Sequence, residues 1–261
     1  LLAAVNDLGF DRLTRVQAEV LPLSLEGRDI VAQAQTGSGK TAAYLLTVFS
    51  RMLRQERRSE IQNPRALIIA PTRELAEQIK KELTAPAKAV KRYVFAVYGG
   101  VSYGPQKQAF RKGVDVLVAT PGRLEDLIEQ RIVDLSQADI VVVDEADRMA
   151  DMGFLPAVRR LLDATARDRQ TLLFSATLDG EVRSLASTFL NQPEMVDIEP
   201  TIKAAESVEQ IAYLVDTDRK RELLSYLVRS RDLHQVLVFT RTKQMTRRLA
   251  SQLDRGGVEA T

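Results

Sequence analysis

The chain has 261 residues, of which 45% are hydrophobic and 28% are charged, and its formal net charge at pH 7 is +2. A charge so near zero excludes nucleic-acid binding by a general polycation effect, so any such binding must be local. The lack of cysteine excludes a disulfide scaffold and thiolate metal sites, and no apolar run approaches the roughly 20 residues that cross a membrane.

Short apolar segments alternate with helical ones over residues 1–200. The first apolar segment is followed by a glycine-rich turn and a helix predicted over residues 42–54, and further helices are predicted over 72–83 and 122–130. The predicted strands are residues 29–34, 66–70, 93–98, 114–119, 140–144, 171–175 and 195–198. This alternation indicates an α/β fold in which a mostly parallel, doubly wound sheet carries helices on both faces.

The composition changes after the seventh predicted strand. Residues 201–207 are polar and rich in alanine, which predicts a linker between a first domain over 1–200 and a second over 208–261. The elements predicted in the second domain are a strand at 208–215, a helix at 219–228, a strand at 235–240 and a helix at 243–253. With only two strands before Thr261, we expect this domain to be cut short.

The turn after the first predicted strand has the composition of a phosphate-binding loop. Its residues are Ala34, Gln35, Thr36, Gly37, Ser38, Gly39, Lys40 and Thr41. The two glycines allow the backbone to fold closely around phosphates, so that N–H groups and the start of the next helix face the anion. Lys40 would reach the β- and γ-phosphates, and the Thr41 hydroxyl suits the oxygen shell of Mg²⁺. The general pattern begins with glycine, where this chain has Ala34.

Asp144 and Glu145 follow four apolar β-branched residues, 140–143, which are typical of a strand buried on both faces of a parallel sheet. Ligands bind at the carboxyl ends of such strands. Asp144 is therefore predicted to hold Mg²⁺, through water, and Glu145 to orient and deprotonate the attacking water. The alternative interpretation is an ordinary acidic helix cap after a core strand.

Polar segments that follow other predicted strands offer donors for phosphate oxygens. Each alone would also suit an ordinary turn or helix start. They are Pro71, Thr72 and Arg73; Gly99 and Gly100; Thr120, Pro121, Gly122 and Arg123; and Ser175, Ala176 and Thr177. Hydroxyls, free N–H groups and arginine are suitable partners for a nucleic-acid backbone.

These segments, in this order, resemble the motifs of the DEAD-box RNA helicases, and the likeness extends over nearly the whole chain. Gly9, Phe10 and residues 13–17 resemble the Q motif, residues 144–147 resemble motif II, and residues 175–177 resemble motif III. Residues 236–243 resemble motif IV of the second RecA-like domain. The resemblance therefore implies a RecA-like P-loop NTPase of bacterial type with part of a second RecA-like domain.

The resemblance also implies roles for individual residues. Gln17 would hydrogen-bond the adenine edge of ATP, because an amide offers the matching donor and acceptor. Ser175 and Thr177 would contact motif II and couple the phosphate chemistry to RNA. The strand-end segments from Pro71 to Arg123 would grip the sugars and phosphates of one RNA strand without reading its base sequence. ATP would close the two domains over the strand and so open a short duplex locally.

Departures from the family pattern limit these expectations. Leu13 stands where the Q motif usually has proline, and motifs V and VI, with an arginine finger, would lie beyond Thr261. Since such an arginine contributes about 10³ to 10⁵ in rate, we expect residues 1–261 alone to be nearly inactive.

The expected cofactors are ATP and Mg²⁺, and the expected partner is RNA. Protein partners are not indicated, and neither a membrane-spanning run nor a secretory signal is evident, so we expect a cytoplasmic protein. Two alternative functions remain open. One is a DNA helicase with the same core, and the other is a non-catalytic RNA clamp switched by ATP.

Overall fold

The computed structural model of the chain describes residues 12–54, 63–198, 209 and 211–260. The chain divides into two compact units, Leu1–Thr201 and Ile202–Thr261. The predicted linker at 201–207 and the Q-motif residues Gly9 and Phe10 lie outside the described residues.

The first unit contains a seven-stranded sheet in which every neighbouring pair is parallel. The strand order is β3-β4-β2-β5-β6-β1-β7. The strands are β1 (Ile30–Gln33), β2 (Ala66–Ile69), β3 (Val94–Val97), β4 (Val116–Ala119), β5 (Ile140–Val143), β6 (Gln170–Ser175) and β7 (Glu194–Asp197). The prediction of a parallel α/β fold is confirmed, and each predicted strand of this unit is present.

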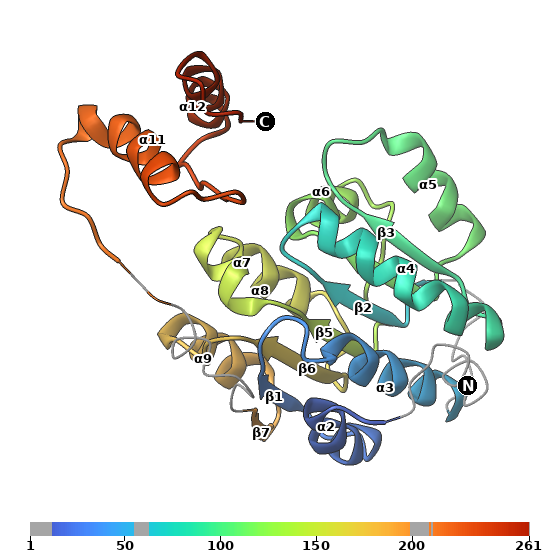
Figure 1. Ribbon diagram of the computed structural model, residues 1–261. Helices are drawn as coiled ribbons and strands as arrows, with labels where there is room; N and C mark the ends of the chain where they lie inside the picture. Colours follow the sequence, from blue (N-terminus) through green and yellow to red (C-terminus); the bar gives the residue numbers. More distant parts are fainter. Residues whose placement is uncertain (1–11, 55–62, 199–208, 210, 261) are drawn as a thin grey trace. The chain divides into compact units, whose positions relative to one another are not determined.

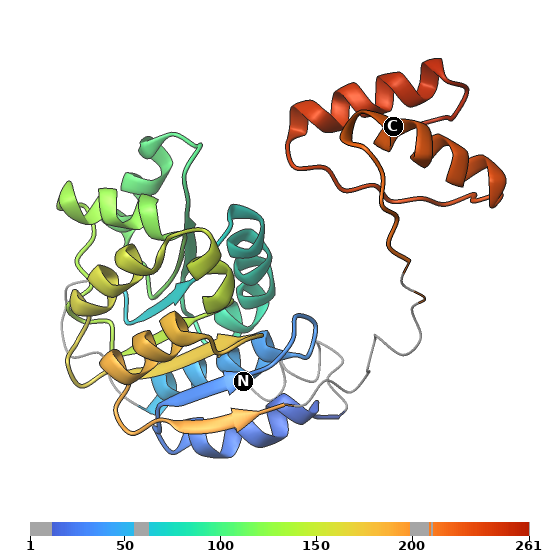
Figure 2. The same cartoon turned by 90° about the vertical axis from the view of Figure 1, so that its left-hand side faces the viewer.

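Helices pack against both faces of the sheet (Figure 1, Figure 2). One face carries α2 (Arg15–Leu25), α3 (Lys40–Arg54) and α4 (Arg73–Ala89). The other face carries α5 (Tyr103–Lys112), α6 (Pro121–Glu129), α7 (Ala146–Asp151), α8 (Leu155–Asp163) and α9 (Gly180–Phe189). In the described part of the chain, no helix has the length and apolar character needed to span a membrane.

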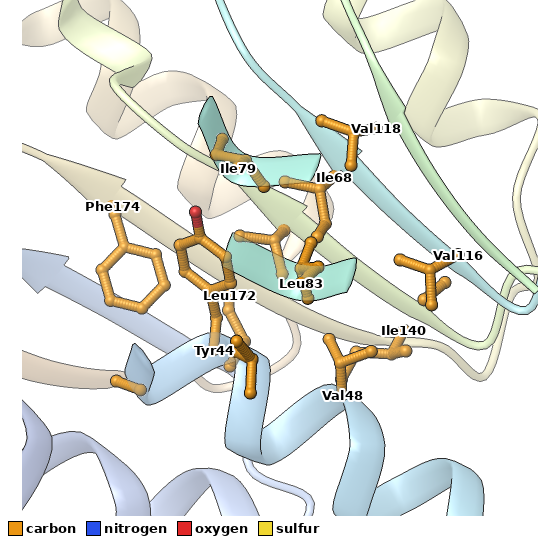
Figure 3. Packing of buried hydrophobic residues seen from close by; sticks show 14 of the residues in the cluster. Tyr44, Val48, Ile68, Ile79, Leu83, Val116, Val118, Ile140, Leu172 and Phe174 are labelled. Atoms are coloured by element: carbon orange, nitrogen blue, oxygen red, sulfur yellow. The ribbon is translucent and has the colours of Figure 1, made fainter. Parts of the chain in front are cut away.

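Side chains that point alternately to the two faces of the sheet divide the core into two layers. In β5, Ile140 and Val142 contact the layer of α2, α3 and α4, whereas Val141 and Val143 contact the opposite layer. Side chains of a strand alternate between the two faces of its sheet, so a strand between two helical layers must be apolar throughout. Figure 3 shows the first layer, in which Val48 of α3 and Ile79 of α4 meet the sheet residues.

Buried aspartates mark the amino ends of three strands. Asp29, Asp115 and Asp139 directly precede β1, β4 and β5, and each has at most 9% of its surface exposed. Asp139 lies 3.3 Å from the guanidinium of Arg65, which is also buried, and 3.8 Å from that of Arg51. Charges buried in this way need ion-pair or hydrogen-bond partners, so removing one partner from this edge of the sheet would be costly.

The second unit contains the short helix η1 (Thr217–Arg219), α11 (Lys220–Ser230) and α12 (Lys243–Arg255). The predicted helices are therefore present. The predicted strands at 208–215 and 235–240 are wrong, because none of the residues described in those ranges belongs to a strand. An apolar pattern shows that a segment can be extended, but a strand exists only when a neighbouring strand supplies its hydrogen bonds.

Candidate functional site

The phosphate-type loop and the acidic strand end meet at the carboxyl edge of the sheet. The loop follows β1 and Asp144 follows β5, and β6 is the strand between them. The Nζ of Lys40 lies 3.6 Å from Oδ1 of Asp144 and donates a hydrogen bond of 3.2 Å to the carbonyl of Ala34. Lys40 and Asp144 are 6% and 2% exposed, respectively. The two residues can therefore share one ligand.

The backbone of the loop suits a close approach to an anion. Gly37 and Gly39 have φ angles of +82° and +94°, which residues other than glycine rarely adopt. Lys40 is the first residue of α3, so the positive end of this helix faces the loop. The Oγ of Ser38 is buried and has no hydrogen-bond partner among the described residues. Buried polar atoms usually have partners, so this hydroxyl suits a hydrogen bond to a phosphate oxygen.

Asp144 is held by a tyrosine that the sequence interpretation missed. The hydroxyl of Tyr44 donates to Oδ2 of Asp144 at 3.2 Å, while Oδ1 has no hydrogen-bond partner among the described residues. Burial raises the pKa of Asp144 above its ordinary value, and the positive charge of Lys40 opposes this effect. The missed signal was spacing, since Tyr44 follows Lys40 by four residues and so shares its helix face.

The residues near the loop fit a magnesium ion. No group of three or more acidic, histidine or cysteine side chains that could hold a metal occurs in the described residues. The protein would contribute only the Thr41 hydroxyl and Oδ1 of Asp144, which makes no hydrogen bond among the described residues and lies 3.6 Å from the Lys40 ammonium. Mg²⁺ usually keeps several waters and binds phosphate oxygens beside one or two carboxylates, so this small donor set is sufficient.

Glu145 is held beside the loop in an unusual backbone conformation. Its φ and ψ are 55° and 53°, a left-handed geometry that costs energy for a residue other than glycine. Its Oε2 accepts a hydrogen bond of 3.1 Å from Arg148, and its Oε1 lies 3.4 Å from the Thr36 hydroxyl, which donates to it. The strained turn places a carboxylate on the loop side of the strand end.

Asp147 links the acidic segment to the end of β6. One of its carboxylate oxygens accepts from the backbone N–H groups of Ala176 and Thr177, at 3.2 and 3.1 Å, and from the Thr177 hydroxyl at 3.3 Å. The backbone N–H of Asp147 in turn donates to the Ser175 hydroxyl at 3.1 Å. Ser175 and Thr177 therefore contact the segment that carries Asp144 and Glu145.

Gln17 is buried against the phosphate-type loop. Its Oε1 accepts from the backbone N–H of Thr14 at 3.0 Å, and its Nε2 donates to the carbonyl of Gly39 at 3.1 Å. Both polar atoms of the amide are thus engaged within the protein. The structure ties the start of α2 to the loop through Gln17, and the second N–H of Nε2 and the second lone pair of Oε1 can still contact an adenine edge.

The remaining predicted residues lie at the ends of β2, β3 and β4, which are neighbours in the sheet. Pro71 and Thr72 follow β2, and the Thr72 hydroxyl caps α4 by accepting from the N–H of Leu75 at 3.2 Å. Gly99 and Gly100 follow β3 and are exposed, while Thr120 precedes α6, whose first residues are Pro121 and Gly122. This edge presents two helix N-termini and a glycine turn side by side.

Each of the two predicted RNA-binding arginines packs on the ring of a tyrosine. Arg73 is exposed, and its guanidinium carbon lies 4.9 Å from the ring centre of Tyr98. Arg123 lies 4.3 Å from the ring centre of Tyr103 and donates to the carbonyl of Val101 at 3.0 Å, so only 10% of its side chain is exposed. Arg73 is presented to solvent, whereas Arg123 fixes the loop after β3.

The chain is similar in sequence to known RNA helicases. A family model described as DEAD/DEAH box helicase matches residues 14–185. The ATP-dependent RNA helicase RhlB of Pseudomonas aeruginosa is 43% identical over 265 residues, which cover 100% of this chain and 67% of that protein. The RhlB of Xanthomonas oryzae is also 43% identical, over 98% of this chain and 46% of its own longer sequence.

Solved structures show the same fold. A hypothetical ATP-dependent RNA helicase from Sulfolobus tokodaii is 33% identical with a TM-score of 0.68, covering 97% of this chain and 71% of that one. The RNA helicase Prp28 from Chaetomium thermophilum, bound to ADP, is 35% identical with a TM-score of 0.70, covering 98% of this chain and 61% of that one. The expected RecA-like architecture is therefore confirmed.

Proposed function

The chain belongs to the DEAD/DEAH box helicase family, as an ATP-dependent RNA helicase of the DEAD-box type, and from this we propose that its strand-end site binds ATP with Mg²⁺ and grips RNA by its backbone. The observation that carries the nucleotide part is the convergence of Lys40 and Asp144, 3.6 Å apart at the mouth of a glycine-rich loop. No other arrangement of a lysine and a carboxylate in the described residues combines such a loop with a helix N-terminus.

Different protein groups would bind the phosphates, hold the metal and activate the water during transfer of the γ-phosphoryl group to water. Lys40 would leave the carbonyl of Ala34 to contact the β- and γ-phosphates. The Thr41 hydroxyl and Asp144 would hold Mg²⁺, whose positive charge would offset that of the phosphates. Glu145 would accept a proton from the attacking water while the water oxygen bonds to the γ-phosphorus and ADP departs. Glu145 already lies on the loop side, held by Arg148 and Thr36.

The RNA part of the proposal is supported by the neighbouring ends of β2, β3 and β4. Arg73, the exposed Gly99–Gly100 turn, and the N-terminus of α6 would contact successive phosphates and sugars. These groups carry no pattern that distinguishes bases. The bonds of Asp147 to Ala176 and Thr177 connect the acidic segment after β5 to the end of β6, and β5 is the sheet neighbour of β2.

A comparison of ATPase stimulation tests this proposal. The protein in its full-length context should hydrolyse ATP faster with single-stranded RNA than without it, and much less so with DNA of the same sequence. Equal stimulation by DNA would support a DNA helicase instead. RNA retention without any turnover would support a clamp.

A further inference from the structure

Tyr44 places a polar atom at the boundary between the core and the nucleotide site. The residue lies in α3 and is fully buried, with its ring centre 5.6 Å from that of Phe174 (Figure 3). Its hydroxyl donates to Oδ2 of Asp144 at 3.2 Å. Burial raises the pKa of Tyr44 well above its usual value, the charge of Asp144 adds to this effect, and a hydrogen bond from the Thr41 side chain opposes it.

The packing of the ring alone does not require this hydroxyl. The cluster around Tyr44 is formed by aliphatic and aromatic side chains such as Val48, Ile68 and Leu172, and a phenylalanine would fill nearly the same volume. A buried hydroxyl is costly unless it is hydrogen-bonded. The hydrogen-bond partner of this one is Asp144, a residue that would hold Mg²⁺.

We propose that Tyr44 is a positioning residue for magnesium binding, which orients the Asp144 carboxylate by holding its Oδ2 so that Oδ1 remains available for the metal or its water. This inference rests on the proposed function. The distribution of partners supports it, because Oδ2 is bonded to the hydroxyl while the buried Oδ1 has no hydrogen-bond partner among the described residues.

Asp144 needs a hydrogen-bond partner of this kind because the last torsion of its side chain is otherwise weakly restricted. The final torsion of an aspartate side chain is broad, so an unsupported carboxylate would rotate and turn either oxygen toward the loop. A hydrogen bond to one oxygen fixes the plane of the group. Removal of an outer partner of this kind typically weakens metal affinity by about 10–100-fold.

The test replaces Tyr44 by phenylalanine in the full-length protein and measures the affinity for fluorescent N-methylanthraniloyl-ADP, with MgCl₂ and with EDTA. In Tyr44→Phe we expect the gain in affinity caused by Mg²⁺ to fall by about tenfold or more, while the affinity in EDTA stays unchanged. Tyr93→Phe is the matched control, because Tyr93 is half exposed at the opposite end of the sheet, just before β3. It should retain the wild-type gain.

A double-variant cycle shows whether the effect passes through Asp144. In an Asp144→Asn background, Tyr44→Phe should cause no further loss of the magnesium gain. The inference is overturned if Tyr44→Phe retains the full gain, or if it weakens binding equally with MgCl₂ and with EDTA, because the hydroxyl would then have only a structural role. If the wild type itself shows no magnesium gain, the proposed magnesium site fails and the inference fails with it.

Discussion

Lys40 and Asp144 form a buried ion pair, with Nζ and Oδ1 3.6 Å apart, although they follow strands that are not neighbours. The intervening β6 ends at Ser175 and is followed by Ala176, both with small side chains, and the Ser175 hydroxyl donates to the carbonyl of Thr177 at 2.6 Å. The loop after β1 can therefore reach across to β5. The positive charge of the lysine therefore lies beside the carboxylate that would hold the metal.

Glycine at position 39 should be more critical than glycine at position 37. Both have positive φ angles, so alanine at either position adds strain of about 1–2 kcal/mol. A Cβ at Gly39 would also lie 2.7 Å from Nε2 of Gln17 and 2.8 Å from Oγ1 of Thr14, whereas at Gly37 it meets nothing within 4 Å. Titration with ADP should show a clearly larger affinity loss for Gly39→Ala, and equal losses would contradict the contact with Gln17.

Replacement of Glu145 by glutamine should separate binding from turnover. The amide keeps the size of the side chain and can still contact Thr36, but it cannot accept a proton from water. In the full-length protein, ATP affinity should stay within a few-fold of the wild type while hydrolysis falls by about 10² or more. Steady-state ATPase assays and nucleotide titration measure the two effects. Retained turnover would remove Glu145 from the role of base.

Asp144→Asn should stabilise the ligand-free protein at neutral pH. Because burial raises the folded-state pKa of Asp144 above 3.8, its ionisation is less favourable in the folded than in the unfolded chain. The resulting cost to the free energy of folding is absent below the pKa of the unfolded chain. It grows as pH rises toward the pKa of the folded chain and is constant above that pKa. Thermal melting should therefore show a higher Tm for Asp144→Asn near pH 7 and a smaller difference in acid. A lower Tm at pH 7 would contradict this account.

The amino edge of the sheet should depend on Asp139. Its removal takes the 3.3 Å carboxylate away from the buried guanidinium of Arg65, and breaking a buried pair from one side costs up to about 3–5 kcal/mol. Urea unfolding of Asp139→Ala should show a loss of this size. Asp197→Ala, at an exposed position of β7, is the control and should change stability by less than about 0.5 kcal/mol.

The two arginines of the proposed RNA edge should differ in their effects. Arg73 is exposed, so Arg73→Ala should remove about one phosphate contact and reduce the salt dependence of RNA affinity by about 0.7 in the log–log slope. Arg123 is bonded to Val101 and stacked on Tyr103, so Arg123→Ala should weaken RNA binding mainly by releasing the loop after β3. RNA titrations at several salt concentrations measure both. Identical slopes for Arg73→Ala and the wild type would exclude a phosphate contact.

The sequence predicted the sheet well because buried strands and phosphate loops have local signatures. Residues 140–143 are apolar and β-branched, and they form β5, the strand that ends at Asp144. The loop glycines have the positive φ angles that their role requires. The site residues that were predicted from β1 and β5 do lie together, because the carboxyl ends of parallel strands share an edge.

Other features depend on contacts that a single sequence does not reveal. Tyr44 has the appearance of a core residue, and only the fold shows that its hydroxyl reaches Asp144. The involvement of Gln17 with Gly39, and of Arg123 with Val101, likewise depends on segments distant in sequence. In the second unit, the apolar residues at 235–240 predicted a strand, but none of them belongs to one, because strand pairing is a property of two segments.

The central claim is that one triphosphate and its metal are held between the loop after β1 and the carboxylate after β5. The most direct test is a crystal structure of the protein with a non-hydrolysable ATP analogue and Mn²⁺, in which anomalous scattering locates the metal. We predict one metal peak between the Thr41 hydroxyl and Asp144, with Nζ of Lys40 moved from the carbonyl of Ala34 to the phosphates. A nucleotide bound elsewhere, with Lys40 and Asp144 still paired to each other, would contradict the account.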